Sequence, residues 1–248
     1  MEGVVGFHPV REALRARRRR LLRLHVREGL RHPGLPELVE LAGAAGVPVE
    51  WARGEALPLE PGLRTQGLWL EAGPLPELDL GGLLVATAGR VGARRLVLLD
   101  GVEDPQNAGA VARVADASGA DALVLTARRS PPLGAAMCRA SAGALEHLPV
   151  ARVSNLARAL IALREAGFWS VGADAAARES LFAAPDRVFQ GDLALVFGAE
   201  GRGLRPGVAR QLDHRLRIPL AGHVGSLNVA AAAAVVLFEA LRRGPPPG

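Results

Sequence analysis

The chain has 248 residues, of which 49% are apolar and 22% charged, so it can bury a hydrophobic core and wholesale disorder is excluded. All 30 basic residues are arginine, and the net charge of +5 fits an acidic partner such as RNA without requiring one. The single cysteine, Cys138, excludes an intramolecular disulfide and a cysteine-based zinc site. The longest apolar stretch, residues 229–238, is about half a membrane span. We therefore expect a cytoplasmic protein with no metal and no membrane contact.

The first 72 residues alternate segments typical of helices and strands, which predicts a small α/β domain over residues 1–72. A helix is expected over residues 8–20, and it would end in a run of four arginines. A second helix is expected around residues 38–45, because its apolar residues have helical spacing and Gly46 would stop it. Strands are expected at residues 21–26, 47–51 and 68–71.

A stretch rich in glycine and proline, residues 73–92, predicts a linker with a short helix around residues 83–86. In the domain beyond it, residues 93–248, a helix that begins at Leu156 has Asn155 as its predicted cap and Gly167 after its end. Alternation of helices with apolar strands predicts an α/β fold, with a mostly parallel sheet covered on both faces and a ligand site beyond the carboxyl ends of its strands. The expected strands are residues 96–99, 122–125, 169–172, 193–197 and 216–219.

Three of these strands are followed by loops with unusual polar residues. Asn107 and Arg113 follow the first, where Asn107 is a candidate helix cap and Arg113 a candidate solvated residue. Glu200 follows the fourth within a glycine-rich turn, where the backbone can approach a ligand closely. Asn228 and Ser226 follow the fifth and are candidate caps of an apolar helix, residues 229–243. We expect this helix to be buried because it is apolar nearly all round.

Together the three loops resemble the three motifs of the SpoU/TrmH family of RNA ribose 2′-O-methyltransferases, in the SPOUT superfamily. The resemblance spans residues 96–243. It implies a knotted, mostly parallel sheet, S-adenosylmethionine as cofactor and a homodimer. The motifs that carry it are Asn107-Ala108-Gly109 with Arg113, then Phe197-Gly198-Ala199-Glu200-Gly201, then Ile218-Pro219 followed by Ser226-Leu227-Asn228-Val229.

Two further segments are similar to the 23S rRNA guanosine enzymes of that family. They are Gly6-Phe7-His8-Pro9-Val10 near the start and Ala140-Ser141-Ala142-Gly143-Ala144 with Glu146 later. This similarity implies an RNA-binding domain like ribosomal protein L30e over residues 1–72, and 2′-O-methylation of a guanosine in 23S rRNA. Two alternatives stay open: a tRNA ribose methyltransferase of the same family, and an RNA-binding protein without activity.

The resemblance assigns roles to individual residues. It casts Arg113 as the group that activates the ribose hydroxyl, yet a guanidinium rarely gives up its proton, so we favour electrostatic stabilisation over general base catalysis. The other residues expected in the catalytic site are Asn107, Glu200, Ser226 and Asn228, with Glu200 orienting Arg113 or Asn107. Cofactor contacts are expected from Gly198, Ile218 and Leu227. RNA contacts are expected from His8, Arg17, Arg18, Arg19, Arg20 and Ser141.

Overall fold

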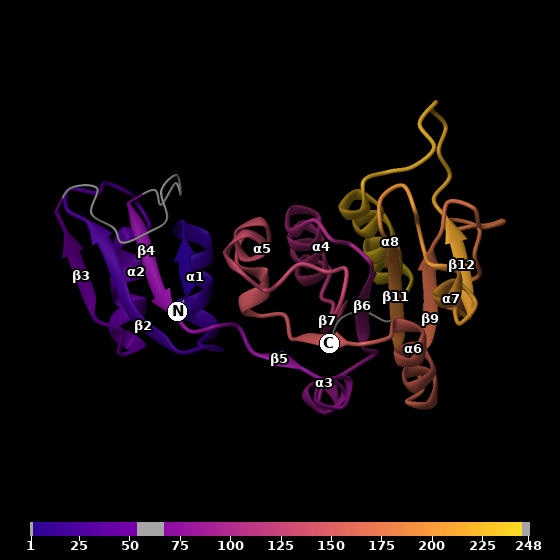
Figure 1. Cartoon of the computed structure of the whole chain (residues 1–248), viewed down its shortest axis with the longest axis horizontal. Helices are drawn as coiled ribbons and strands as arrows, with labels where there is room; N and C mark the ends of the chain where they lie inside the picture. The colour runs from indigo at the N-terminus through magenta and orange to yellow at the C-terminus, as the bar shows by residue number, and fades with distance from the viewer. Residues whose placement is uncertain (1, 54–66, 245–248) are drawn as a thin grey trace.

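The computed structural model describes residues 2–53 and 67–244, which form two separate β-sheets (Figure 1). Residues 1, 54–66 and 245–248, which fall within the predicted domains 1–72 and 93–248, lie outside the described residues. The smaller sheet is built from the N-terminal part of the chain and the larger one from the remainder, as expected from the alternation of elements in the sequence.

The N-terminal sheet is mixed and has helices on one face. Its strand order is β1-β4-β2-β3, in which only β2 and β3 are parallel. Alternate residues of β2 and β4, such as Leu24 and Leu70, are buried with Leu14 and Leu38 of the two helices in one apolar cluster. The elements are β1 (Glu2–Val5), α1 (Phe7–Ala16), β2 (Leu21–Arg27), α2 (Leu35–Ala44), β3 (Val49–Ala52) and β4 (Leu68–Ala72).

The predicted helix over residues 8–20 is wrong at its C-terminal end. Helix α1 ends at Ala16 because Arg17 adopts a left-handed conformation, with φ 51°, and its N–H donates to the carbonyl of Ala13. The other three arginines of the run therefore lie on the turn that leads into β2, and Arg19 among them is buried.

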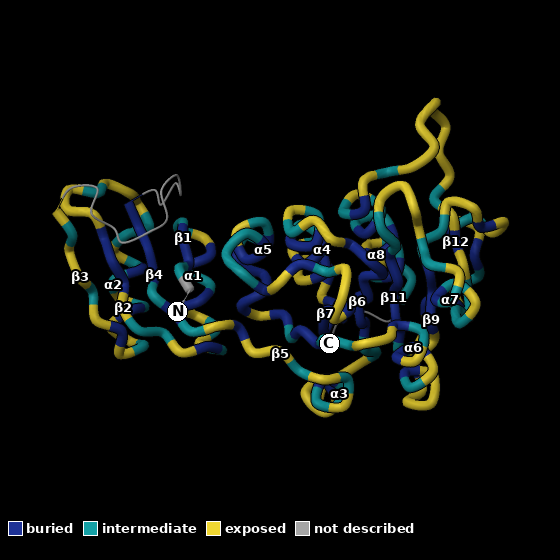
Figure 2. Tube along the Cα trace, viewed as in Figure 1, coloured by how far each residue is buried: buried dark blue, intermediate teal, exposed yellow. Residues whose placement is uncertain are grey.

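The large sheet is parallel throughout, which confirms the predicted α/β fold class. Its order is β10-β12-β9-β11-β6-β7-β8-β5. Every pair of neighbouring strands is parallel. The central strands are buried on both faces, whereas the loop between β12 and α8 is exposed (Figure 2). The strands are β5 (Glu77–Leu78), β6 (Arg95–Asp100), β7 (Ala122–Thr126), β8 (Val150–Val153), β9 (Trp169–Ala173), β10 (Glu179–Ser180), β11 (Leu193–Gly198) and β12 (His214–Arg217).

Helices cover both faces of this sheet, as predicted. One apolar cluster holds α4 (Pro105–Ala117), α5 (Ala135–Ala140), α8 (Val229–Arg243) and the 3-10 helices η1 (Ala144–Glu146) and η2 (Asp186–Phe189). The other holds α3 (Leu80–Thr87), α6 (Leu156–Glu165) and α7 (Pro206–Ala209). The Asn155 side chain caps α6 by accepting from the N–H of Arg158, as expected from its position.

Two segments differ from their predicted roles. The stretch predicted as a linker, residues 73–92, contains β5 and α3; β5 pairs with β8, and Leu83 of α3 is fully buried, so only residues before Glu77 connect the two sheets. Helix α8 has its predicted bounds but is not buried all round, because Phe238 is 48% exposed. No helix within residues 2–53 and 67–244 is long and apolar enough to span a membrane.

Candidate active site

The three motif loops meet at one edge of the large sheet. They follow β6, β11 and β12, and parallel strands all present their carboxyl ends at the same edge. Strands β6 and β11 are direct neighbours, and β12 is separated from β11 only by β9. The fold therefore brings together loops that are well separated in the chain: Asn228 is 28 residues from Glu200 and 121 from Asn107.

The side-chain amide of Asn228 joins all three loops. Its Nδ2 donates to Asn107 Oδ1 at 2.9 Å and to Glu200 Oε1 at 2.5 Å. Its Oδ1 accepts from the N–H of Ala230 at 2.9 Å, which caps α8. The backbone N–H of Val229 lies 3.4 Å from the same oxygen of Glu200. One amide group thus serves both as the predicted helix cap and as the centre of the predicted site.

Asn107 can take part because it is not the cap of α4. Asp104 occupies that position, and its carboxylate accepts from the N–H of Gln106 at 3.0 Å. Asn107 lies within the first turn of the helix, so its side chain is available to Asn228. The expectation that Asn107 caps the helix is wrong, since the capping residue lies three positions earlier.

The loop after β11 turns back on itself within a few residues. Gly203 donates its N–H to the carbonyl of Ala199 at 2.8 Å, and Gly201 and Gly203 have φ angles of 74° and 63°. A side chain on Gly198 would collide with the backbone of Gly203. The glycines therefore allow a tight turn that holds Glu200 at the edge of the sheet.

A first cavity of about 400 Å³ opens between these loops. Gly198, Ile218 and Leu227, the residues expected to contact the cofactor, all line it, and so do Ser226 and Glu200. Its walls are mainly backbone and apolar side chains, with the carboxylate of Asp174 among them. The volume and the lining are those of a small-molecule site with a few polar anchors.

A second cavity of about 300 Å³ shares its wall with the first, through residues that include Ala199 and Glu200. Its charged lining residues are the three arginines Arg129, Arg202 and Arg205 and the four carboxylates Asp100, Glu103, Asp104 and Glu200. Arg205 is paired with the buried carboxylate of Asp100, whereas Arg129 and Arg202 form no ion pair within residues 2–53 and 67–244. Two adjoining cavities suit a site that holds two substrates, and the two unpaired arginines are available to an anionic group of one of them.

Arg129 and Arg202 were not predicted as site residues. Arg129 follows β7, whose carboxyl end lies at the same edge as those of β6 and β11. Arg129 could have been predicted from the tendency of ligands to bind at this edge of a parallel sheet, but the loop after β7 carries no recognisable motif. Arg202 lies inside the second motif loop, next to Glu200.

Arg113 does not join the hydrogen-bonded cluster. It is exposed on α4, six residues beyond Asn107, and within the described part of the chain its guanidinium forms no hydrogen bond or ion pair. Glu200 bonds Asn228 rather than Arg113 or Asn107, which differs from the orienting role expected for it. Arg113 is thus a free cation on the helix that also carries Asn107.

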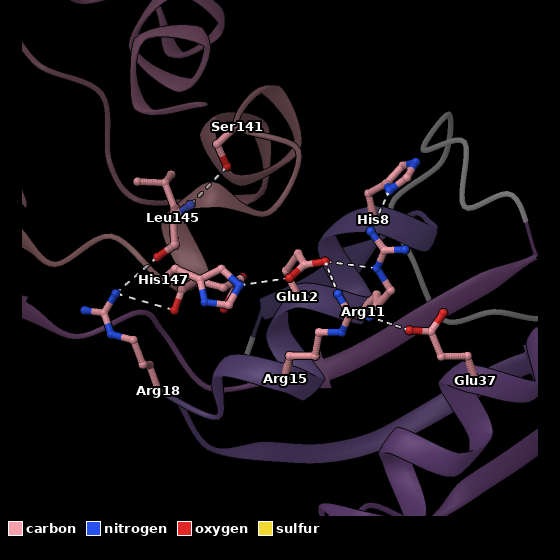
Figure 3. Close-up of polar contacts among 10 residues, drawn as sticks. His8, Arg11, Glu12, Arg15, Arg18, Glu37, Ser141, Leu145 and His147 are labelled. Carbon is pink, nitrogen blue, oxygen red and sulfur yellow. Dashed lines mark hydrogen bonds and ion pairs between the residues drawn. The ribbon is translucent and has the colours of Figure 1, made fainter. Parts of the chain in front are cut away.

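The residues expected to contact RNA separate into exposed and buried sets. His8, Arg17 and Arg20 are exposed, and Arg18 is half-buried with its guanidinium near the carbonyls of the η1 segment (Figure 3). The expectation for Arg19 is wrong, because its side chain is 1% exposed and is paired with a carboxylate. The expectation for Ser141 is also wrong. Its residue is 1% exposed, and its hydroxyl donates to the Cys138 carbonyl at 2.7 Å.

No group of three or more histidine, cysteine, aspartate or glutamate side chains in the described residues is arranged to hold a metal ion.

Both parts of the chain match models of known protein families. Residues 94–238 match the SpoU rRNA Methylase family, and residues 4–76 match the family described as RNA 2′-O ribose methyltransferase substrate binding. Among relatives, YacO of Bacillus subtilis (strain 168), named as a TrmH family tRNA/rRNA methyltransferase, is 35% identical over 99% of this chain and 97% of its own length.

Solved structures are similar over nearly the whole chain. The SpoU methyltransferase AviRb from Streptomyces viridochromogenes, in complex with the cofactor AdoMet, superposes with a TM-score of 0.77 and 25% identity, and the match covers 97% of this chain and 89% of that chain. A crystal structure described as an RNA 2′-O ribose methyltransferase gives a TM-score of 0.77 and 26% identity, over 97% of this chain and 88% of that chain.

The two asparagine caps allow the role of Asn228 to be separated from simple helix capping. Asn228→Ala and Asn155→Ala each remove the cap of one helix, so each should destabilise the fold by about 0.5–2 kcal/mol. Only Asn228→Ala also disconnects Glu200 from Asn107, so it alone should lower the rate of methyl transfer to RNA, by about tenfold or more. Thermal unfolding and a methyl-transfer assay measure the two effects. Equal rates of methyl transfer in the two variants would contradict the placement of Asn228 in the catalytic site.

Proposed function

This chain belongs to the SpoU/TrmH family of RNA 2′-O-ribose methyltransferases, with S-adenosylmethionine as cofactor, and we propose that it methylates the 2′-hydroxyl of a guanosine in 23S rRNA. The observation that carries the proposal is the link from Asn228 to Asn107 and Glu200, set between two adjoining cavities. One cavity takes the cofactor and the other receives the nucleotide to be modified.

The first cavity fits S-adenosylmethionine. Its volume of about 400 Å³ lies within the usual range for such ligands. Backbone N–H and C=O groups of Gly198, Ile218 and Leu227 suit the polar edge of a neutral adenine. The charged lining residues Asp174, Glu200 and Arg202 suit a ligand that carries both positive and negative groups. The cofactor supplies an activated methyl group when bound. Ser226, also in the lining, helps to place the ribose against it.

The remaining task of the protein is to make the ribose hydroxyl a better nucleophile. When the oxygen is methylated, the bond from the methyl carbon to the cofactor sulfur breaks and the hydroxyl proton leaves to water. The oxygen carries negative charge to the extent that its proton leaves before the new bond is complete, and a nearby cation stabilises that charge. Arg113 is a permanent cation that no described carboxylate neutralises, so it can lie against this oxygen and the adjoining phosphate. Asn107 and Asn228, fixed by their mutual hydrogen bond, would hold the ribose in line with the methyl group.

The N-terminal domain favours ribosomal RNA as the substrate. Residues 4–76 match a substrate-binding family, and a separate domain of this kind suits the selection of one site in a large folded RNA. His8, Arg17 and Arg20 are exposed on this domain, and we propose them as contacts to RNA. Arg129 and Arg202 would meet phosphates beside the target nucleotide.

Two alternatives to this function are a tRNA ribose methyltransferase and an RNA-binding protein without activity. A tRNA ribose methyltransferase would have the same catalytic site, and the name of the YacO relative includes both kinds of RNA. An RNA-binding protein without activity is disfavoured because the hydrogen bonds among Asn107, Glu200 and Asn228 are all in place.

We place the protein in the cytoplasm, where its RNA substrate is found.

The exposed face of α8 supports a homodimer. Phe238 is 48% exposed on this helix, whose residues 229–238 are all apolar, and Ala231, two turns earlier, is also exposed. Val224, in the loop before the helix, is 68% exposed. Exposed apolar surface of this kind is typical of an interface between subunits.

Removal of Arg113 tests the chemistry. Arg113→Ala should lower the single-turnover rate of methylation by about 10²–10³, because one stabilising donor to the developing oxyanion is lost. Arg113→Lys keeps the charge without the planar fork, so it should recover only part of the rate. Arg158→Ala is the matched control, since Arg158 is exposed on α6, which packs on the other face of the sheet. An Arg113→Ala protein of normal thermal stability and near wild-type rate would refute the assignment.

The substrate is identified by mapping 2′-O-methyl groups on RNA from cells that lack this protein. We expect one guanosine of 23S rRNA to lose its methyl group, and the purified protein to restore it in the presence of S-adenosylmethionine. Loss of a methyl group from tRNA instead would support the alternative substrate and exclude our choice.

The proposed dimer is tested at Phe238. Phe238→Glu places a charge on the exposed apolar face, so sedimentation velocity should show a shift from dimer to monomer. The control is Ile161→Glu, at a residue 41% exposed on α6. A wild-type protein that sediments as a monomer would exclude this interface.

A further inference from the structure

A buried ion pair connects the N-terminal domain to the domain that contains the large sheet. Arg19, on the turn before β2, faces Glu146 of η1, and the two side chains are each 1% exposed. The pair is bidentate: Arg19 Nε donates to Glu146 Oε2 at 3.0 Å and Nη2 donates to Oε1. Arg19 Nη1 also donates to the carbonyl of Gly73, at the start of the connecting segment, at 3.3 Å. One guanidinium therefore holds three segments together.

Further contacts surround this pair. Glu12 of α1 bonds His147 Nε2 at 2.9 Å, and Arg18 Nη1 lies 3.5 Å from the carbonyls of Leu145 and Glu146 (Figure 3). Burial raises the pKa of Glu12, but hydrogen bonds from His147 and from the neighbouring Arg11 oppose this effect, and the pKa lies below its ordinary value. The two domains thus meet through directional polar contacts on both sides of the buried pair.

The backbones also approach closely at this junction. Gly143 has a φ angle of 96°, and a Cβ built on it would lie 2.8 Å from the Cβ of Glu12. Only glycine permits this contact between α1 and the segment before η1. The position of the N-terminal domain is therefore determined by steric fit as well as by charge.

The ion pair contributes more to orientation than to stability. Removing two charges from water costs about as much as their attraction returns, so a buried pair adds little net stability. The Arg19 and Glu146 side chains are each 1% exposed, so both charges are desolvated, and this burial raises the pKa of Glu146 above its ordinary value. A bidentate pair in such surroundings accepts only one relative orientation of its two partners.

The junction is continuous with the candidate active site. Glu146 follows α5, and α5 packs on α4 at Gly109, where a Cβ would lie 2.6 Å from the Met137 carbonyl and 2.5 Å from the Ala140 Cβ. Helix α4 carries both Asn107 and Arg113. A shift of the segment that receives Arg19 would therefore press directly on the helix that holds the site, because these elements touch without intervening space.

We propose that Arg19 and Glu146 are positioning residues, which hold the N-terminal domain in one orientation relative to α4 so that RNA bound by this domain presents its ribose at Arg113. The inference rests on the proposed function. It adds that the junction between the domains, and not the catalytic residues alone, sets the effective concentration of the target ribose at the site. Loss of the junction should weaken productive RNA binding and leave cofactor binding unchanged.

The test replaces both charges together, so that neither is left buried without a partner. Arg19→Met with Glu146→Met keeps comparable volume, and the fold should remain stable. We expect the KM for a 23S rRNA fragment to rise about tenfold or more, with kcat at saturating RNA changed less than threefold. Calorimetry should give an S-adenosylmethionine affinity within twofold of that of the wild type.

A matched control is available in the same domain. Arg23 of β2 and Glu50 of β3 form an ion pair at 2.5 Å, with side chains 50% and 51% exposed, away from the junction residues. Arg23→Met with Glu50→Met removes one positive and one negative charge, as the double variant at the junction does, so the net charge is the same in both. This control should keep the wild-type KM to within about twofold.

A physical readout separates this proposal from the proposed function. Spin labels at Glu40→Cys on α2 and Arg158→Cys on α6, both exposed, report the distance between the domains by pulsed electron paramagnetic resonance. We expect one narrow distribution in the wild type and a broader one in the Arg19–Glu146 double variant. A folded double variant with wild-type KM, or with an unchanged distribution, overturns the positioning role. Failure of the wild type to methylate any RNA would instead refute the proposed function, while the distance measurement would still decide whether the pair fixes the orientation.

Discussion

The side-chain amide of Asn228 is the point on which the catalytic edge of this protein depends. It begins α8 by capping Ala230, and its Nδ2 ties the loop after β11 to the first turn of α4. Its Nδ2 donates to two protein groups and its Oδ1 accepts from a third, so the loops that form the walls of both cavities are held by one planar group with few alternative arrangements. A site that must align a hydroxyl with a methyl group needs this kind of rigidity, because small displacements cost large factors in rate.

Arginine has two distinct uses in this chain, which contains no lysine. Away from the site, arginines pair with nearby carboxylates, as Arg94 does with Asp192 and Arg164 with Asp213. Arg129 and Arg202, at the carboxyl edge of the large sheet, and Arg113, on α4, have no ion-pair partner among residues 2–53 and 67–244. Cations that no carboxylate of the protein neutralises stay available to phosphates.

The junction between the domains shows how a charged residue can take a structural role. Arg19 belongs to a run that resembles a solvated, RNA-binding patch, yet it is the most buried arginine of that run. The left-handed Arg17 ends α1 early and redirects the chain, so that Arg19 enters the interface while Arg17 and Arg20 stay exposed. The motif segment that resembles the ribosomal RNA enzymes supplies the other side of this interface, and its Ser141 and Glu146 are each 1% exposed.

Local sequence patterns determined the elements and the chemistry of this protein. Apolar runs identified the buried strands β6, β7 and β11, because a strand covered on both faces has no polar alternation. Asn155 and Asn228 could be recognised as caps since capping depends on a few neighbouring residues. The short strands β5 and β10 and the burial of Arg19 and Ser141 were decided only by the tertiary structure. Each depends on a partner distant in the chain, such as β8 for β5 or Glu146 for Arg19, 127 residues away. A residue's own neighbours set its conformational preferences, but whether a charge is solvated or paired is decided by what the fold places against it.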